Sequence, residues 1–185
     1  MFCYNQFMRV ISGTARGCKL TAPKGSKTRP TGDRMKEDLF NILSESVRGS
    51  RFLDLFCGSG AMGIEALSRG AEHAVFVDSS NEAVDSVKAN LTKTRLAGRA
   101  DVLHISYEQC FDRLANRFDI IFLDPPYGDL SHNFDKLPAF LSDGGKIILE
   151  CMNGIETPDF NGLIMYRQKK YSQMQFLFFS RGENL

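Results

Sequence analysis

Short apolar runs alternate with longer amphipathic stretches along most of the chain. Runs of this length, rich in Phe, Ile, Leu and Val, are typical of buried strands. From Arg51 onward the pattern is a repeated strand–helix alternation, and only the last two runs follow each other closely. The sequence predicts strands at residues 51–56, 73–78, 100–106, 118–124, 145–151, 163–168 and 174–179.

Apolar residues at helical spacing predict helices between these strands. Ahead of the first strand, a helix is expected to end near Val47, with Asp33 near its positively polarised start. Another helix begins in a glycine turn, and Ser80 can cap the next one. Helices after strands are expected at residues 58–69, 80–91, 108–114 and 136–141.

Strands separated by helices form parallel βαβ units, which build a doubly wound sheet with helices on both faces. The linker at 169–173 is too short for a crossover, so the last two strands should pair antiparallel. Residues 8–20 predict short strands around Gly13 and Gly17. The expected fold is α/β: a mostly parallel, doubly wound, seven-stranded sheet with an antiparallel C-terminal hairpin and a short N-terminal β extension. Ligands of such sheets bind beyond the carboxyl ends of the strands, where the strand order reverses.

The composition is that of an ordinary globular protein: 43% of the 185 residues are hydrophobic and 24% are charged. The length suits one domain, and no apolar run approaches the roughly 18 residues of a membrane span. Residues 1–8 lack the features of a signal peptide, so a cytoplasmic protein without membrane contact is expected. The five cysteines and three histidines lack metal-ligand spacing, and no metal is expected.

Charge is distributed unevenly between the two ends of the chain. Residues 1–36 hold eight Lys or Arg and one acid, whereas the remaining 149 residues hold 15 basic and 21 acidic side chains. A basic segment on a mildly acidic body favours an extension that binds a polyanion, although a solvated surface would look similar. We therefore expect a basic extension at 1–36 and a catalytic domain at 37–185.

A glycine-rich turn follows the first predicted strand, in the segment Asp54-Leu55-Phe56-Cys57-Gly58-Ser59-Gly60. With Gly63 it contains G-x-G-x-x-G, the fingerprint of dinucleotide sites. A dinucleotide places an anionic pyrophosphate at the helix N-terminus, and the Asp54 carboxylate would repel that group. The carboxylate suits a cationic ligand instead, and S-adenosylmethionine carries an ammonium, a sulfonium and no phosphate.

The next two strands add candidate cofactor contacts. Asp78 ends the second strand, 24 residues after Asp54, where an acid commonly accepts hydrogen bonds from ribose hydroxyls. Ser106 ends the third predicted strand and Tyr107 follows it, on the side expected to hold adenine. Tyr107 could pack on a purine ring or belong to the core.

The fourth strand ends in Asp124-Pro125-Pro126-Tyr127. Two prolines stiffen the segment, so that the Asp124 side chain and the Pro125 carbonyl can accept from one amine. Tyr127 offers a surface on which a nucleobase can stack. Two such acceptors localise the lone pair of an exocyclic amine and orient it for methyl transfer, and Asp124 can also take the proton.

These residues resemble the RsmD family, which uses S-adenosylmethionine to methylate guanine N2 in 16S ribosomal RNA. The resemblance covers nearly the whole chain from Met8. It is carried by residues 8–13, Arg16-Gly17, Thr28-Arg29-Pro30-Thr31, Arg34, Glu37, 54–60, Glu65-Ala66-Leu67-Ser68-Arg69-Gly70-Ala71 and 124–127. The chain departs from the family in having Asp78 where members often have Glu, and Ser106 where many have Asp.

The resemblance implies a Rossmann-like class I methyltransferase fold and assigns roles to individual residues. The implied catalytic residues are Asp124, Pro125 and Tyr127. The implied cofactor-binding residues are Asp54, Phe56, Gly58, Gly60, Asp78, Ser106 and Tyr107. The implied RNA-binding residues are Arg9, Arg16, Lys19, Lys24, Lys27, Arg29 and Arg34. The implied partner is 16S ribosomal RNA in an assembling small ribosomal subunit, and we expect the enzyme to act as a monomer.

Three alternatives stay open at the level of sequence. A DNA methyltransferase acting on adenine N6 or cytosine N4 shares the Asp-Pro-Pro-Tyr signature but usually needs extra length to read its target. A nicotinamide-dependent oxidoreductase shares the glycine fingerprint but conflicts with the charge of Asp54. A non-catalytic RNA-binding module conflicts with the intact Asp124 and Tyr127.

Overall fold

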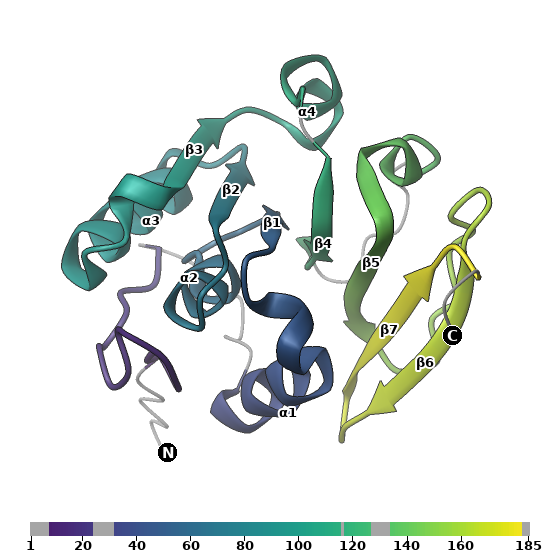
Figure 1. The fold of residues 1–185 in the computed structure, drawn as a ribbon, viewed down its shortest axis with the longest axis horizontal. Coiled ribbons are helices and arrows are strands. Elements are labelled where there is room, and N and C mark those ends of the chain that lie inside the picture. The colour runs from purple at the N-terminus through teal and green to yellow at the C-terminus, as the bar shows by residue number, and fades with distance from the viewer. Residues whose placement is uncertain (1–7, 24–31, 116, 127–133, 183–185) are drawn as a thin grey trace.

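The computed structural model describes residues 8–23, 32–115, 117–126 and 134–182. A seven-stranded sheet in the order β3-β2-β1-β4-β5-β7-β6 forms its centre (Figure 1). The strands are β1 (Arg51–Leu55), β2 (His73–Asp78), β3 (Ala100–His104), β4 (Phe118–Leu123), β5 (Leu141–Met152), β6 (Ile164–Lys170) and β7 (Met174–Ser180). The first five are parallel, and β7 is antiparallel to both β5 and β6. The predicted architecture is confirmed.

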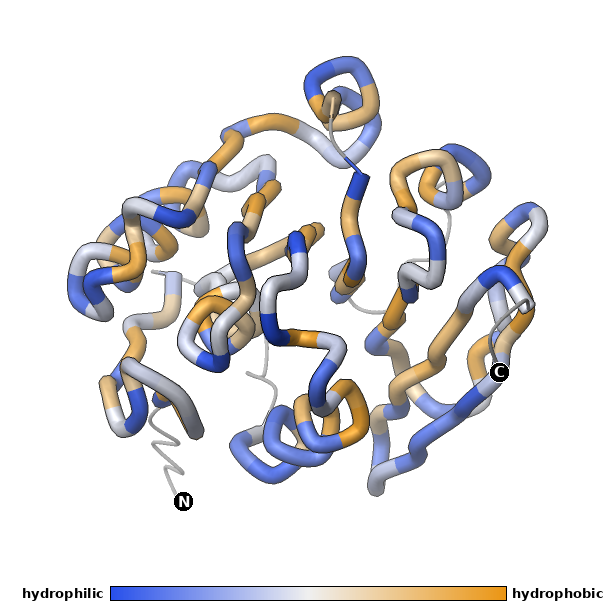
Figure 2. The backbone as a smooth tube through the Cα atoms, viewed as in Figure 1, coloured by the Kyte–Doolittle hydropathy of each residue, from blue (hydrophilic) through white to orange (hydrophobic). Residues whose placement is uncertain are grey.

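Helices cover both faces of this sheet, because successive strand residues alternate between two buried clusters. One cluster joins α1 (Asp33–Leu43), α2 (Ala61–Ser68) and α3 (Asn81–Thr94) to the face that carries Phe52, Phe76 and Phe122. The other joins α4 (Tyr107–Arg113) and the 3-10 turn Leu137–Phe140 to the face that carries Leu53, Val77 and Leu123. In Figure 1, α2 lies below β1, α1 lies near the bottom of the view, and α4 lies at the top. Apolar strands run through the middle of the molecule in Figure 2.

Several boundaries differ from the sequence prediction. The segment expected as a helix at 136–141 is a single 3-10 turn, with Pro138 in its first turn, and β5 begins already at Leu141. Two further 3-10 turns lie at Ser44–Val47 and Ala97–Arg99. None of the helices seen in the described ranges has the length and apolar character of a membrane span.

The prediction of strands at 8–20 is wrong for most of that segment. Its only strand-like feature is one antiparallel bridge between Arg9 and Lys19, and bends and turns occupy residues 12–17. The backbone groups that a partner strand would satisfy are bonded elsewhere: Glu65 accepts from two of them, and Ser68 from two more. Since Val10 and Leu20 are buried in the same cluster as α2, the segment packs as a coil against that helix.

Candidate active site at the junction of β1 and β4

The order of the strands reverses between β1 and β4, which are neighbours although β2 and β3 separate them in sequence. Leu55 pairs with Leu123, so the residues that follow them emerge side by side at one edge of the sheet. The Asp124 N–H donates to the Leu55 carbonyl across 3.4 Å. The glycine turn and the Asp-Pro-Pro segment therefore begin at the position where ligands of open α/β sheets bind. We call this edge, at the carboxyl ends of the parallel strands, the catalytic edge.

The glycine turn requires backbone conformations that few residues adopt. Phe56, Gly58 and Gly60 all have positive φ angles, of 57°, 52° and 73°. A Cβ added at Gly58 would meet nothing within 4 Å, so a ligand can approach the backbone there without obstruction. A Cβ at Gly63 would instead lie 2.4 Å from the Phe76 ring, which makes this glycine a requirement of helix packing.

Asp78 fixes the turn from the neighbouring strand. Its two carboxylate oxygens accept from the backbone N–H of Gly58 and of Ser80, each at 2.9 Å. Both bonds tie the end of β2 to turns that precede helices. A carboxylate has about four acceptor positions, so Asp78 retains capacity for ribose hydroxyls.

Asp54 is buried inside the site, with 2% of its surface exposed, and its Oδ2 accepts from the Gly63 N–H at 2.8 Å. Burial raises the pKa of its carboxyl well above the usual range, the Gly63 bond opposes that rise, and the charges of Asp124 and Asp78 add to it. Three carboxyl groups thus meet at the ends of β1, β2 and β4. Within the described ranges none of them forms an ion pair with Lys or Arg. The site is suited to a cationic ligand.

Asp124 is partly exposed at the end of β4, and Pro125 behind it is buried. Burial raises the pKa of the Asp124 carboxyl to about 7. A carboxyl that titrates near neutral pH can change its protonation state during a reaction. Tyr127, the predicted stacking residue, lies outside the described residues.

Ser106 and Tyr107 begin α4 rather than end β3. The Ser106 hydroxyl accepts from the Gln109 N–H and forms a capping box with that residue. Tyr107 is 4% exposed; its ring stacks on Phe56 at 5.4 Å and meets the edges of Phe111 and Phe134. The Tyr107 ring is thus part of the core, where it supports the strained Phe56, and its contact with adenine stays a prediction.

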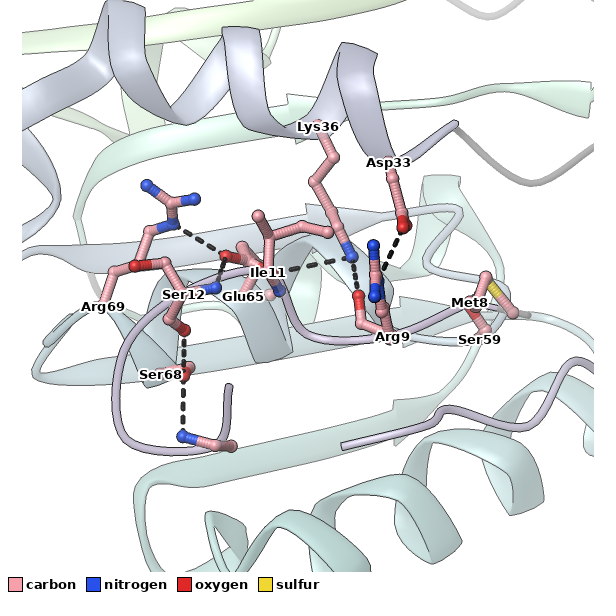
Figure 3. Close-up of polar contacts among 12 residues, drawn as sticks. Met8, Arg9, Ile11, Ser12, Asp33, Lys36, Ser59, Glu65, Ser68 and Arg69 are labelled. Atoms are coloured by element: carbon pink, nitrogen blue, oxygen red, sulfur yellow. Dashed lines mark hydrogen bonds and ion pairs between the residues drawn. The ribbon is translucent and has the colours of Figure 1, made fainter. Parts of the chain in front are cut away.

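Sequence reasoning missed the residues that attach the N-terminal segment. The buried Glu65 accepts from the Ile11 and Ser12 N–H groups at 2.7 and 3.0 Å and from Arg69 Nε at 2.7 Å (Figure 3). Lys36, also buried, lies 3.5 Å from Glu65 and donates to the Arg9 carbonyl. One signal was available: Glu65 is the only charged residue in the otherwise apolar or small sequence AMGIEALS.

A second connection joins the N-terminal segment to the glycine turn. The buried carboxamide of Asn90 pairs with both backbone groups of Thr21 and donates to the Ser59 carbonyl at 3.0 Å. Ser59 also contacts Met8 at 3.3 Å. Residues 8–21 of the predicted basic extension are therefore joined through Asn90 to the glycine turn of the predicted cofactor site.

The predicted RNA-binding residues that the structure describes are exposed. They are Arg9, Arg16, Lys19 and Arg34. Arg9 forms an exposed ion pair with Asp33 at 2.8 Å. Lys24, Lys27 and Arg29 lie outside the described residues.

Comparisons with known proteins agree with this geometry. Residues 8–180 match the model of the family described as Conserved hypothetical protein 95. Ribosomal RNA small subunit methyltransferase D of Escherichia coli K12 is 32% identical over 183 residues, which cover 94% of this chain and 90% of that protein. YlbH of Bacillus subtilis is 42% identical over 177 residues, covering 89% and 94% of the two chains.

A solved structure has the same arrangement of elements. That of yhhF from Escherichia coli superposes with a TM-score of 0.78 at 32% identity and covers 92% of this chain and 96% of its own. The fold is the Rossmann-like class I methyltransferase fold. Since the family model spans most of the chain and the relatives match it almost end to end, the chain belongs to the RsmD family.

Proposed function

We propose that this protein transfers a methyl group from S-adenosylmethionine to the exocyclic N2 of a guanine in 16S ribosomal RNA. The observation that carries the proposal is the meeting of Asp54, Asp78 and Asp124 at the strand-order reversal. The names of the relatives support ribosomal RNA as the substrate class. We further propose that the enzyme acts on this RNA within an assembling small ribosomal subunit.

The residues present fit this cofactor. Among the described residues, the buried Asp54 and the partly exposed Asp78 and Asp124 have no cationic partner, which favours a ligand that carries positive charge. The open space at Gly58 admits such a ligand close to the backbone. When bound, S-adenosylmethionine supplies the methyl group from its sulfonium. Asp78 is placed to accept from ribose, and Phe56, Gly60 and Ser106 form the remaining wall of the proposed cofactor site.

The protein's part in the reaction is to hold and orient the amine. The Asp124 carboxylate and the Pro125 carbonyl each accept one of its hydrogens, which localises the nitrogen lone pair and aims it at the methyl group. Asp124 then stabilises the positive charge that develops on nitrogen and takes the proton that this nitrogen loses when it is methylated. Tyr127 is proposed to stack on the base, which must leave its helix to reach the pocket.

Binding of S-adenosylhomocysteine tests the cofactor class. We expect it to raise the melting temperature, whereas NAD should leave it unchanged, because the pyrophosphate of NAD is repelled by Asp54. Differential scanning fluorimetry of the full chain measures both. Stabilisation by NAD alone would contradict the proposal. The base specificity is tested by transfer of labelled methyl groups to small ribosomal subunits, followed by nucleoside mass spectrometry of their 16S ribosomal RNA, with N6-methyladenosine or no product as contrary results.

The pKa of Asp124 predicts how the rate depends on pH. Below about 7 the carboxyl is protonated and presents a donor to the amine, so kcat/KM should rise as pH increases through about 7 and then level off. The positive charge of the bound cofactor favours the ionised form of Asp124, so kcat should rise at a lower pH than kcat/KM does. Steady-state assays from about pH 5.5 to 9 measure both profiles. An identical rise in the Asp124→Asn variant would show that another group titrates.

A further inference from the structure

The C-terminal hairpin lies in a stretch of the chain that holds cations without acids, as most of the basic N-terminal segment also does. From Phe160 to Gly182 there is no Asp or Glu, but there are four basic residues. Arg167, Lys169 and Lys170 lie on β6, the edge strand of the sheet, where all three are exposed. The strand is largely hydrophilic beside the apolar β7 in Figure 2. This basic strand is unexpected, because the chain beyond residue 36 has an excess of acids.

The sheet register places these cations at the catalytic edge. Leu123 pairs with Leu149, Leu149 with Leu177, and Leu177 with Gln168. The next residue along β4 is Asp124 and the next along β6 is Lys169, and β6 runs in the same direction as β4 because two antiparallel pairings separate it from β5. Lys169 and Asp124 therefore lie at the same level of the sheet. Three strand spacings between β4 and β6 amount to ~14 Å.

The hairpin tip is held in place rather than projecting freely. Asn153, just after β5, donates through its side chain to the carbonyls of Tyr171 and Ser172. The Tyr171 hydroxyl donates to Asp38 on α1 at 3.2 Å. These bonds fix the end of β6 against both the sheet and α1. Arg34, one helical turn before Asp38, brings a further exposed cation to the same side.

The β6 cations are not committed to acids of the protein. Across the residues that the structure describes, Arg167, Lys169 and Lys170 form no ion pair, whereas Lys36, Arg69 and Arg9 all do. Lys169 Nζ lies 5.9 Å from the Tyr171 ring centroid. Charged side chains also protect edge strands from pairing with other molecules, which is the competing explanation of the pattern.

We propose that the exposed cations of β6, led by Lys169 and Lys170, bind the phosphate backbone of the RNA substrate beside the target nucleotide. The proposal rests on the proposed function, since it adds a second RNA contact to that site. With the basic N-terminal segment attached to the glycine turn and β6 beyond β5 and β7, cationic surfaces flank Asp124 from both sides. Phosphate contacts of this kind position an RNA without reading its sequence.

The test compares two variants with the same change in charge. Lys169→Gln with Lys170→Gln removes two cations from β6. Lys88→Gln with Lys93→Gln removes two exposed cations from α3, at the opposite end of the sheet (Figure 1). Filter binding of a 16S ribosomal RNA transcript over a salt series measures each slope of log K against log salt. We expect the β6 variant to flatten this slope by about 1.4–1.8 and to lower affinity about tenfold at physiological salt, and the α3 variant to resemble the wild type.

Three further measurements separate the outcomes. Calorimetric titration with S-adenosylhomocysteine should give the same affinity for both variants. If the wild type does not bind S-adenosylhomocysteine, the proposed cofactor is refuted, whereas the RNA contact is still decided by the salt dependence of RNA binding. Equal slopes for the two variants would overturn the β6 contact. Self-association of the β6 variant in sedimentation velocity with an unchanged salt slope would also overturn it, and would assign the lysines to protection of the edge strand.

Discussion

The Asp124→Ala variant is expected to lose methyl transfer by about 10³-fold with little change in affinity for S-adenosylhomocysteine. The reason is that the proposed role of this carboxylate falls on the amine nitrogen, whose charge develops only during the reaction. Asp54 and Asp78 remain to hold the glycine turn through their bonds to Gly63 and Gly58. Single-turnover rates with labelled cofactor and calorimetric affinities measure the two quantities separately.

Asp119→Asn is the matched control, because Asp119 lies on the same strand at the opposite edge and accepts from the Arg51 N–H. Its turnover should stay close to that of the wild type. Equal losses in the two variants would mean that β4 as a whole, rather than the Asp124 carboxylate, is required. Unchanged turnover in Asp124→Ala would refute the role proposed for this residue.

The largest effect on stability is expected from Glu65→Ala, at about 3–5 kcal/mol in the free energy of unfolding. Glu65 and Lys36 are both buried, and burial lowers the pKa of Lys36 while the charge of Glu65 opposes that shift. Without Glu65, the Lys36 ammonium loses its ion-pair partner, and the Ile11 and Ser12 N–H groups lose their hydrogen-bond acceptor. Urea unfolding followed by circular dichroism measures the loss. The exposed Glu72→Ala should change stability by less than about 0.5 kcal/mol.

A double variant separates the two contributions of Glu65. Lys36→Met with Glu65→Leu leaves no unpaired charge at the Lys36 position, so it should recover part of the stability. It still offers no acceptor to Ile11 and Ser12, so limited proteolysis should cut the segment at 8–21 faster than in the wild type. Protection equal to that of the wild type would show that packing of Val10 and Leu20 is enough to hold the segment.

The centre of the sheet could be predicted because β1, β2 and β4 are buried on both faces. The runs that became β1, β2 and β4 are almost continuously apolar, and the observed bounds differ from the predicted ones by one residue at most. The length of the short linker before Met174 was by itself enough to predict the antiparallel hairpin. Hydrophobic periodicity was least informative at Leu137–Phe140, where a four-residue 3-10 turn that includes Pro138 replaces the expected helix.

The glycine turn and Asp124 could be placed from sequence, because parallel strands end at one edge of a sheet. What the sequence could not provide were contacts between distant segments. Tyr107 has the same neighbours along the chain whether or not its ring belongs to the core, and only its packing on Phe56 places it there. The isolated charge of Glu65 in an apolar helix likewise did not reveal its partners, because Ile11 and Lys36 are far from it in sequence.

The β6 cations could not be found from the net charge of long segments of the chain. The net charge beyond residue 36 is negative, which concealed a strand whose exposed side chains are all neutral or basic. Their position level with Asp124 depends on three strand pairings, and only the pairing of β6 with β7 is local in sequence. Only the register of the whole sheet brings Lys169 level with Asp124.

The attachment of residues 8–21 has a consequence for how the molecule acquires its shape during translation. Ile11 is synthesised 54 residues before Glu65, and Thr21 is synthesised 69 residues before Asn90. Translation proceeds at about 5–20 residues per second, so the Glu65 and Asn90 side chains are made several seconds after the backbone groups that they bind. Residues 8–21 therefore reach their final conformation only after translation has passed Asn90 in α3.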